Sequence, residues 1–327
     1  MRHVLVIRLS ALGDVALMVP VLKGYAEGNP EVRFTVAAPP MLQPLFEGMP
    51  NVEFLGLKKK QSFVKIYRAL EAVGADTVVD LHKVNRVGMA LMVLRLRHLL
   101  NFGFHIYALR KGRLSRWLFL HHWSRRPRKH QYERYDDVFR RAGLKKNENS
   151  KLKIENSADA TRNTQFIIGV APFSQHEGKV WPWENVERLV EMLNEKGYRV
   201  ILFGSKEEAP RLEALAEGNE MVSSVAGKQS FAEELEIIRG LSLMVSMDSA
   251  NMHFASAMGV PVVSVWGATH PDFGFYGYGQ NCANALCANL RCQPCSAFGE
   301  KACRYGDYRC LRAITPEMVM EKILKQF

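Results

Sequence analysis

The chain has 327 residues, of which 47% are hydrophobic, and this suffices for two globular domains. Such a composition excludes an intrinsically disordered protein. No uninterrupted apolar run reaches the roughly 20 residues that span a bilayer. Residues Met1 to Arg8 also lack the apolar region and cleavage site of a signal peptide. We therefore expect a cytoplasmic protein.

The net charge of +11 is concentrated in one segment. Between Leu81 and Tyr132 there is no Asp or Glu, but there are twelve Lys or Arg. A local basic surface predicts an anionic partner, and nucleic acid, a phosphorylated lipid and a membrane surface all remain open. Trp117 and Trp123 among these cations suit a membrane interface or a single-stranded nucleic acid. A solvated helix face without a partner is the alternative.

Apolar strand patterns alternate with helical patterns along the first half. Strands are expected at 4–7, 33–37, 52–55, 76–81 and 99–104, and helices at 15–25, 61–73 and 85–96. This alternation predicts the α/β class with a doubly wound parallel sheet. No G-x-G-x-x-G motif and no P-loop follows the first strand.

The turn after the first strand carries a candidate general base. Gly13 lets the backbone approach a ligand, and Asp14 stands at the head of the next helix. Loops at the carboxyl ends of parallel strands line the binding crevice of such sheets. Asp14 therefore has the right position for a base, and its alternative role is that of helix N-cap.

Residues 145–165 are rich in Asn, Ser, Lys and Glu and are expected to form the interdomain linker. We therefore expect an N-terminal domain over 1–160 and a C-terminal domain over 161–327. The last helix, 316–327, is a candidate to pack back on the N-terminal domain. In the second half, strands are expected at 166–171, 200–203, 243–246 and 260–265, and helices at 184–196, 230–240 and 251–258.

A strand, two small residues and a helix succeed one another between Ser246 and His253. The first amides of a helix have no internal partner and carry the positive end of the helix dipole, which favours a diphosphate. Asp248, Ser249 and His253 add polar side chains there. The alternative is an ordinary turn in which Asp248 is the N-cap.

Two further groups stand on loops after predicted strands of this half. Lys179 is a candidate phosphate contact, although a surface lysine is usually only solvated. Glu207 or Glu208 can accept hydrogen bonds from ribose hydroxyls, although acidic residues also favour a helix start without any ligand.

All six cysteines lie between Cys282 and Cys310. Four of them have a spacing compatible with a zinc site: Cys292, Cys295, Cys303 and Cys310. Reduced thiols in an irregular loop are the alternative. A basic nucleic-acid-binding protein with a four-cysteine zinc site is therefore a rival function.

Short motifs follow one another along almost the whole chain. They are Ile7–Val15, Val79–His82, His130–Tyr135, Lys179–Pro182, Phe203–Ser205, Asp248–Ala255, Gly259–Pro261 and Trp266–Thr269. In this order and spacing the chain resembles glycosyltransferase family 9, the ADP-heptose:lipopolysaccharide heptosyltransferases. Two features depart from the family: Ser249-Ala250 replaces the Thr-Gly or Ser-Gly of many heptosyltransferases, and Leu91 to Trp123 matches no family motif.

The resemblance implies a GT-B fold, in which two Rossmann-like doubly wound domains face a central cleft. It implies an inverting, metal-independent glycosyltransferase that needs no cofactor. This enzyme would move a heptose or related sugar from an ADP-sugar to a lipopolysaccharide core or similar lipid-linked glycan. The nearest alternative is the same fold with a different nucleotide-sugar donor.

The resemblance also implies roles for single residues. Asp14 would be the catalytic base, and Glu207 or Glu208 would bind the ribose. The donor diphosphate would be bound by Lys179, Asp248, Ser249, Ala250, Asn251 and His253. The acceptor would be bound by Ser10, Gly13, His82, Arg86 and His130. The expected partners are the nucleotide-sugar, an anionic lipid-linked glycan and the cytoplasmic face of the inner membrane, without nucleic acid.

Overall fold

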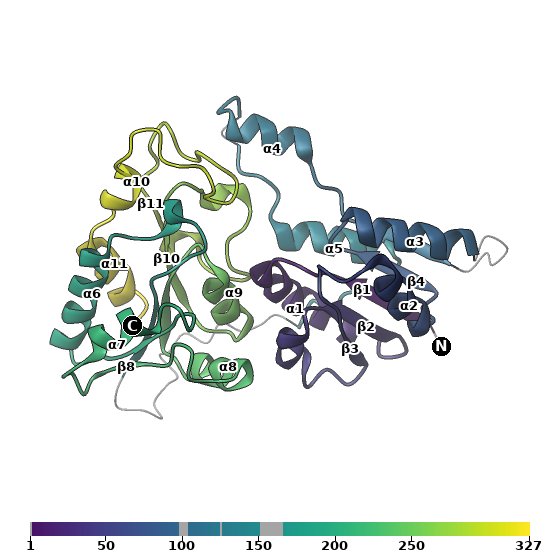
Figure 1. Ribbon diagram of the computed structural model, residues 1–327, viewed down its shortest axis with the longest axis horizontal. Helices are drawn as coiled ribbons and strands as arrows, with labels where there is room; N and C mark the ends of the chain where they lie inside the picture. Colours follow the sequence, from purple (N-terminus) through teal and green to yellow (C-terminus); the bar gives the residue numbers. More distant parts are fainter. Residues whose placement is uncertain (1, 98–103, 125, 151–165) are drawn as a thin grey trace. The chain divides into compact units, whose positions relative to one another are not determined.

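The computed structural model describes residues 2–97, 104–124, 126–150 and 166–327 (Figure 1). This part of the chain divides into two compact units. The first unit holds the described residues up to 111 together with 131–150, and the second holds the remainder. The expected boundary at residue 160 lies outside the described residues, as does most of the expected linker.

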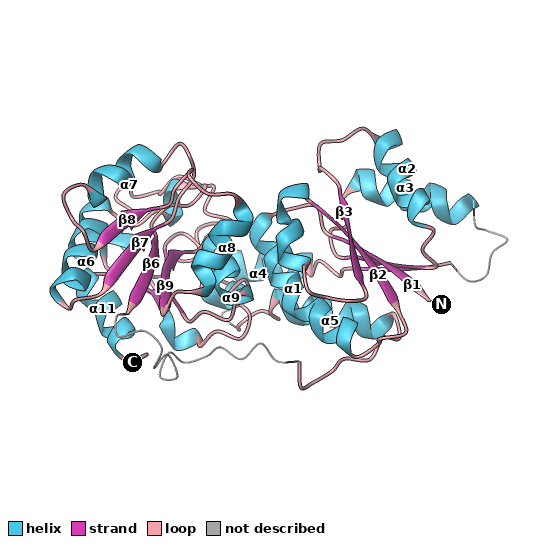
Figure 2. Ribbon diagram, turned by 90° about the horizontal axis from the view of Figure 1, so that it is seen from below, coloured by secondary structure: helices cyan, strands magenta, loops and turns pink. Residues whose placement is uncertain are grey.

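The first unit is a five-stranded parallel sheet in the order β3-β2-β1-β4-β5. Its strands are β1 (His3–Ile7), β2 (Arg33–Ala38), β3 (Val52–Gly56), β4 (Thr77–Asp80) and β5 (His105–Ala108). Its helices are α1 (Leu12–Glu27), the 3-10 helix η1 (Pro40–Phe46), α2 (Phe63–Val73), α3 (Asn85–Arg97) and α5 (Gln131–Arg141). Helices cover both faces of the sheet (Figure 2), which explains why the inner strands are apolar throughout.

The second unit is a six-stranded parallel sheet in the order β11-β10-β9-β6-β7-β8. Its strands are β6 (Ile167–Ala171), β7 (Arg199–Leu202), β8 (Val222–Ser224), β9 (Leu243–Met247), β10 (Val262–Trp266) and β11 (Ala285–Cys287). Its α-helices are α4 (Arg113–Leu120), α6 (Trp183–Glu195), α7 (Ala209–Ala216), α8 (Phe231–Arg239), α9 (Ala250–Ala257), α10 (Arg309–Arg312) and α11 (Pro316–Leu324). Its described residues also form the 3-10 helices η3 (Glu177–Lys179), η4 (Pro271–Phe273) and η5 (Cys282–Asn284).

Residues 112–130 pack with the second unit, although they precede the last helix of the first. Phe119 of α4 is buried against Phe273, with ring centroids 5.6 Å apart. The amide of Arg128 donates to the carbonyl of Asp272 at 2.8 Å, and the Arg128 guanidinium lies 4.7 Å from the Phe273 ring centroid. These aromatic and backbone contacts cross about 150 positions of sequence, so no local pattern predicts them.

The terminal helix α11 lies in the core of the second unit. Val319, Met320 and Ile323 are buried there, and α11 packs against α6 and β10. The expectation that the last helix packs back on the N-terminal domain stays a prediction.

Each sheet has one point at which the strand order reverses. In the first unit this point lies between β1 and β4, and in the second between β6 and β9. The carboxyl ends are level there, because Ile7 pairs with Asp80 and Ala171 pairs with Ser246. Ligands of doubly wound sheets bind outside the strand ends at such points. Each unit therefore presents one candidate binding position.

Candidate active site

Asp14 lies at the carboxyl end of β1, in the first turn of α1. Its carboxylate forms an ion pair with Arg8, and the Tyr135 hydroxyl donates to it at 3.3 Å. The N-cap of the helix is Ala11, so Asp14 is not the cap that its sequence position also allowed. Its oxygen accepts the Ala11 amide at 3.4 Å instead. The carboxylate is held by groups from two elements and remains partly accessible to solvent.

Tyr135 of α5 contributes a fixed proton donor to this group. Its side chain is fully buried, and burial raises the pKa of its phenol above the ordinary value. The hydroxyl therefore stays protonated and donates to Asp14 at neutral pH. Arg8 is also buried, and its guanidinium lies 5.7 Å from the Tyr135 ring centroid.

His82 lies next to Ser10 at the same end of the sheet. Its Nε2 is 3.0 Å from the Ser10 hydroxyl oxygen. The turn between β4 and His82 is fixed by the buried Asp80, whose carboxylate accepts the amides of His82 and Lys83 at 2.9 and 2.8 Å. Burial, aided by the positive charge of Arg8, lowers the pKa of His82 to about 4. The imidazole is therefore neutral at physiological pH.

The shifted pKa of His82 predicts a loss of stability in mild acid. An unfolded histidine, with a pKa near 6.5, binds a proton between about pH 6.5 and 4, whereas folded His82 does not. The free energy of unfolding is therefore unaffected by this group above pH 6.5. As the pH falls below 6.5, protonation of the unfolded chain lowers the free energy of unfolding by up to about 3 kcal/mol. Comparing thermal midpoints of the native protein and His82→Gln at about pH 7.5 and 4.5 checks this. The thermal midpoint of the native protein should fall further between these pH values than that of His82→Gln. An equal fall in both proteins would contradict the lowered pKa of His82.

In the second unit, Lys179 and Asp248 bring the ends of β6 and β9 together. The Lys179 ammonium lies 3.2 Å from the Asp248 carboxylate, and both side chains are largely buried. The Thr269 hydroxyl donates to the same carboxylate oxygen at 2.8 Å, and the Ser174 hydroxyl donates to the Asp248 carbonyl at 3.3 Å. This network fixes the lysine at the strand ends.

The loop that carries Lys179 lies against the residues after β10. The Ala268 amide donates to the Gly178 carbonyl at 2.7 Å. A Cβ added to Gly267 would meet that carbonyl at 2.3 Å, and one added to Gly178 would meet the Ala268 Cβ at 2.9 Å. The absence of side chains at both glycines therefore permits the approach that positions Lys179.

Ser249 is the N-cap of α9, and its backbone is extended. Its hydroxyl lies 3.1 Å from that of Ser246. Ala250 and Asn251 are the first two helical residues, and His253 is buried one turn further on. Asp248 precedes the cap, so its N-cap alternative is wrong. Helix α9 therefore begins two residues after Asp248, the residue that pairs with Lys179.

Glu207 and Glu208 follow β7 at the same sheet edge. One carboxylate oxygen of Glu208 accepts the Ser205 amide at 2.7 Å, which holds the turn before α7. Glu207 is exposed to solvent. Both acids therefore lie near the end of β7, and Glu208 already accepts a backbone hydrogen bond.

Two of the expected acceptor residues lie on other parts of the chain than the strand-end turns that carry Ser10, Gly13 and His82. Arg86 lies exposed on α3, where its guanidinium contacts the Gln61 carbonyl at 3.4 Å. His130 packs with the second unit, whereas the others belong to the first. Its backbone runs close to Gly274, whose added Cβ would lie 3.2 Å from the His130 Cα.

The structure does not support the four-cysteine zinc site. Among the residues it describes, no group of three or more His, Cys, Asp or Glu side chains is arranged to hold a metal ion. Burial, together with the nearby Cys thiols, raises the pKa of Cys295 to about 11 and that of Cys310 to about 12. Zinc binds the thiolate, so zinc binding here would have to displace the protons of these two thiols.

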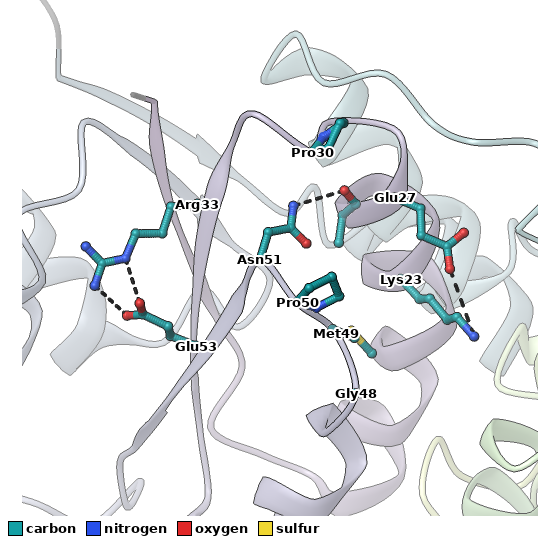
Figure 3. Close-up of a pocket in the computed structure, with 10 residues that line it drawn as sticks. Lys23, Glu27, Pro30, Arg33, Gly48, Met49, Pro50, Asn51 and Glu53 are labelled. Atoms are coloured by element: carbon teal, nitrogen blue, oxygen red, sulfur yellow. Dashed lines mark hydrogen bonds and ion pairs between the residues drawn. The ribbon is translucent and has the colours of Figure 1, made fainter.

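A cavity of about 570 Å³ lies at the opposite edge of the first sheet, beside the start of β2 and β3 (Figure 3). Its charged groups are already paired, Arg33 with Glu53 and Lys23 with Glu27. The Asn51 side-chain amide donates hydrogen bonds to backbone carbonyls, among them that of Ala26. We therefore assign this cavity no part in the chemistry at the carboxyl ends.

Four residues of the two networks were not expected from the sequence as site residues. They are Arg8, Tyr135, Ser174 and Thr269. Arg8, Tyr135 and Thr269 lie within the quoted motifs, so each of these three carried a signal. Arg8 pairs with the nearby Asp14, whereas the partners of the other three are more distant in sequence, and only tertiary packing identifies them.

The chain matches the model of a known protein family. The model of "Glycosyltransferase family 9 (heptosyltransferase)" matches residues 63–308. The chain belongs to glycosyltransferase family 9. It is therefore a glycosyltransferase, as the motifs predicted, and the four-cysteine nucleic-acid-binding alternative is wrong.

Individual relatives agree with this family. The chain is 26% identical to lipopolysaccharide heptosyltransferase 1 of Escherichia coli K12 over 304 residues, which cover 85% of this chain and 92% of the relative. It is 33% identical to lipooligosaccharide heptosyltransferase 2 of Haemophilus influenzae over 113 residues, a third of each chain.

Solved structures show the same fold. A family 9 glycosyltransferase from Veillonella parvula superposes with a TM-score of 0.74 at 20% identity, over 99% of this chain and 97% of the other. The Escherichia coli ADP-heptose lipopolysaccharide heptosyltransferase II gives 0.66 at 21% identity, over 100% and 98%. The GT-B fold with two doubly wound domains is thus confirmed.

Proposed function

We propose that this glycosyltransferase moves a heptose from an ADP-sugar to a lipopolysaccharide core or a similar lipid-linked glycan. The observation that carries the proposal is the network of Lys179, Asp248 and Thr269 beside the start of α9. A fixed cation and free helix amides suit the diphosphate of a nucleotide-sugar. Relatives named as heptosyltransferases over most of their length support the choice of sugar.

In the proposed reaction, Asp14 accepts the proton of the acceptor hydroxyl. The acceptor oxygen forms a bond to the anomeric carbon, and the bond from that carbon to the diphosphate breaks on the opposite side. The transfer therefore inverts the anomeric configuration. Negative charge grows on the departing ADP, where Lys179, His253 and the amides of Ala250 and Asn251 stabilise it without a metal ion.

The Lys179–Asp248 pair prepares the lysine for this task. A lysine held by one carboxylate loses little further side-chain entropy when the diphosphate arrives. Asp248 is a positioning group in this account, because its charge is balanced by Lys179 and its oxygen is occupied by Thr269. Ribose binding is assigned to the turn with Glu207 and Glu208.

Positive charge surrounds the proposed acceptor residues of the first unit. Lys59, Lys111 and Arg8 all act electrostatically on His82. The Lys111 ammonium is placed by the Lys83 carbonyl, at 2.7 Å. An acceptor with phosphate or carboxylate groups fits this surrounding, and neutral His82 orients the Ser10 hydroxyl within it. Gly13, which directly precedes Asp14, is buried.

We also propose that the enzyme acts at the cytoplasmic face of the inner membrane. A lipid-linked acceptor remains in the bilayer, so the enzyme has to reach the bilayer surface. No described helix is both long enough and apolar enough to cross a membrane. We assign the contact with the bilayer to side chains on the surface of the enzyme.

Calorimetric titration with ADP, UDP and GDP tests the choice of donor. ADP should bind, and the other two should bind at least about tenfold more weakly. Stronger binding of UDP or GDP would favour the alternative, a different nucleotide-sugar on the same fold. Failure of all three to bind would contradict the diphosphate site itself.

A further inference from the structure

Helix α3 is apolar on two sides. Its inner side packs on the first sheet and on α2 through Val87, Ala90, Leu91 and Leu94, which are all buried. A helix that covers a sheet normally has a polar outer side. The outer side of α3 instead carries four large apolar residues.

These four residues form one stripe. Met89 is 51% exposed, Met92 58%, Val93 38% and Leu96 60%. Their spacing of three, one and three positions puts them on one face of the helix. Single exposed apolar residues need no explanation, but a continuous stripe of this kind marks an interaction surface.

Basic residues border the stripe. Arg86 and Arg95 lie on α3 itself and are exposed. Arg86 contacts the Gln61 carbonyl, which places the exposed run Lys58–Lys60 beside the start of α3. On the neighbouring α2, Lys65 and Arg68 are also exposed. The acid of α2 is Glu71, and it is already paired with Arg97.

We infer that this stripe is the surface with which the enzyme rests on a bilayer that contains anionic phospholipids. The four apolar side chains enter the boundary between headgroups and acyl chains, and the flanking Lys and Arg side chains contact the headgroups. The inference deepens the proposed function, on which it rests, by naming the membrane-contacting element.

Charge decides between a bilayer and a second copy of the chain. Two copies that met through this face would bring their Lys58–Lys60 runs and α3 arginines together. Like charges at an interface oppose association. An anionic bilayer covers the same apolar stripe and neutralises the same cations.

The stripe also lies close to the proposed acceptor residues within the same unit. Helix α3 begins three residues after His82, and the stripe from Met89 to Leu96 occupies about the second and third turns of the helix. A bilayer against α3 therefore brings the headgroup of a lipid-linked acceptor toward the end of β4. Substrate need not leave the membrane to reach it.

Sedimentation with vesicles tests the inference without donor or acceptor, so its outcome is independent of catalysis. The full chain is mixed with phosphatidylglycerol-containing vesicles and with pure phosphatidylcholine vesicles. A Met92→Glu, Leu96→Glu double variant is compared with Met41→Glu, Met318→Glu. The control positions are exposed to 53% and 41% and lie off the stripe, and both variants add the same two negative charges. Circular dichroism verifies that each is folded.

The native chain and the control variant should bind the anionic vesicles, and the stripe variant should bind at least about tenfold more weakly. Absence of native binding would overturn the inference. An equal loss of vesicle binding in both variants would also overturn the inference, because the two added negative charges alone would then explain the loss. A dimer of the native chain that the stripe variant abolishes would show that the face binds a second copy instead.

Discussion

Asp14→Asn is expected to lower kcat for sugar transfer by about 10²–10⁴-fold. The asparagine keeps the size of the side chain and an oxygen that accepts from Tyr135, but it does not take up a proton at neutral pH. The donor network of Lys179 and Asp248 belongs to the other unit, so the affinity for ADP should stay unchanged. The loss should therefore appear in kcat.

Initial rates of ADP release in the presence of acceptor measure this effect. Glu31→Gln is the matched control, because Glu31 is an exposed acid of the same unit. A thermal scan is needed beside the kinetics, since Arg8 is buried and loses its ionic partner in the variant. A folded Asp14→Asn enzyme with native kcat would show that Asp14 is not the base. It would equally fit a protein that binds the sugar nucleotide without using Asp14.

Lys179→Ala is expected to weaken ADP binding by about 10- to 100-fold. A hydrogen bond to a charged group contributes about 1.5–3 kcal/mol, and about 1.4 kcal/mol corresponds to a factor of ten. The variant also leaves Asp248 without its cation, so its carboxylate repels the diphosphate. The effect should therefore lie at the upper end of the range.

Calorimetry with ADP measures this second effect, and Lys196→Ala serves as its control. Lys196 is exposed at the end of α6 and has the same charge. His253→Ala should weaken binding in the same direction. Native affinity in Lys179→Ala would contradict the diphosphate site, even if transfer activity were intact.

The inner strands of both sheets could be predicted closely. Strands β1, β4, β6 and β9 are short apolar runs followed by polar turns, and all are buried on both faces. In a parallel sheet this pattern also fixes which end carries the ligand-binding loops. The positions of Asp14 and of Asp248 at strand ends followed directly.

Apart from β3, the edge strands could not be predicted as well. The fifth strand was expected at 99–104, but β5 begins at His105, and 99–103 lie outside the described residues. Strands β8 and β11 have three residues each and were missed. Such short strands form because a neighbour supplies the hydrogen bonds, and their own sequences carry little periodicity.

Long-range contacts were the other limit. The buried pair of Phe119 and Phe273 draws residues 112–130 to the second unit, and with them His130. The Arg8 ion pair with Asp14 is local, but the Tyr135 hydroxyl comes from more than a hundred residues away. Sequence spacing predicted the strand-end positions of Asp14 and Asp248, and tertiary packing determined the partners of these residues.

The most direct test of the central claim is transfer itself. The full chain is incubated with ADP-heptose and a lipopolysaccharide acceptor that lacks heptose, and the product is examined by mass spectrometry and NMR. We expect that one heptose is added, that ADP is released, and that the anomeric configuration is inverted, also in the presence of a chelator. An acceptor that remains unmodified while another nucleotide-sugar is consumed would contradict it.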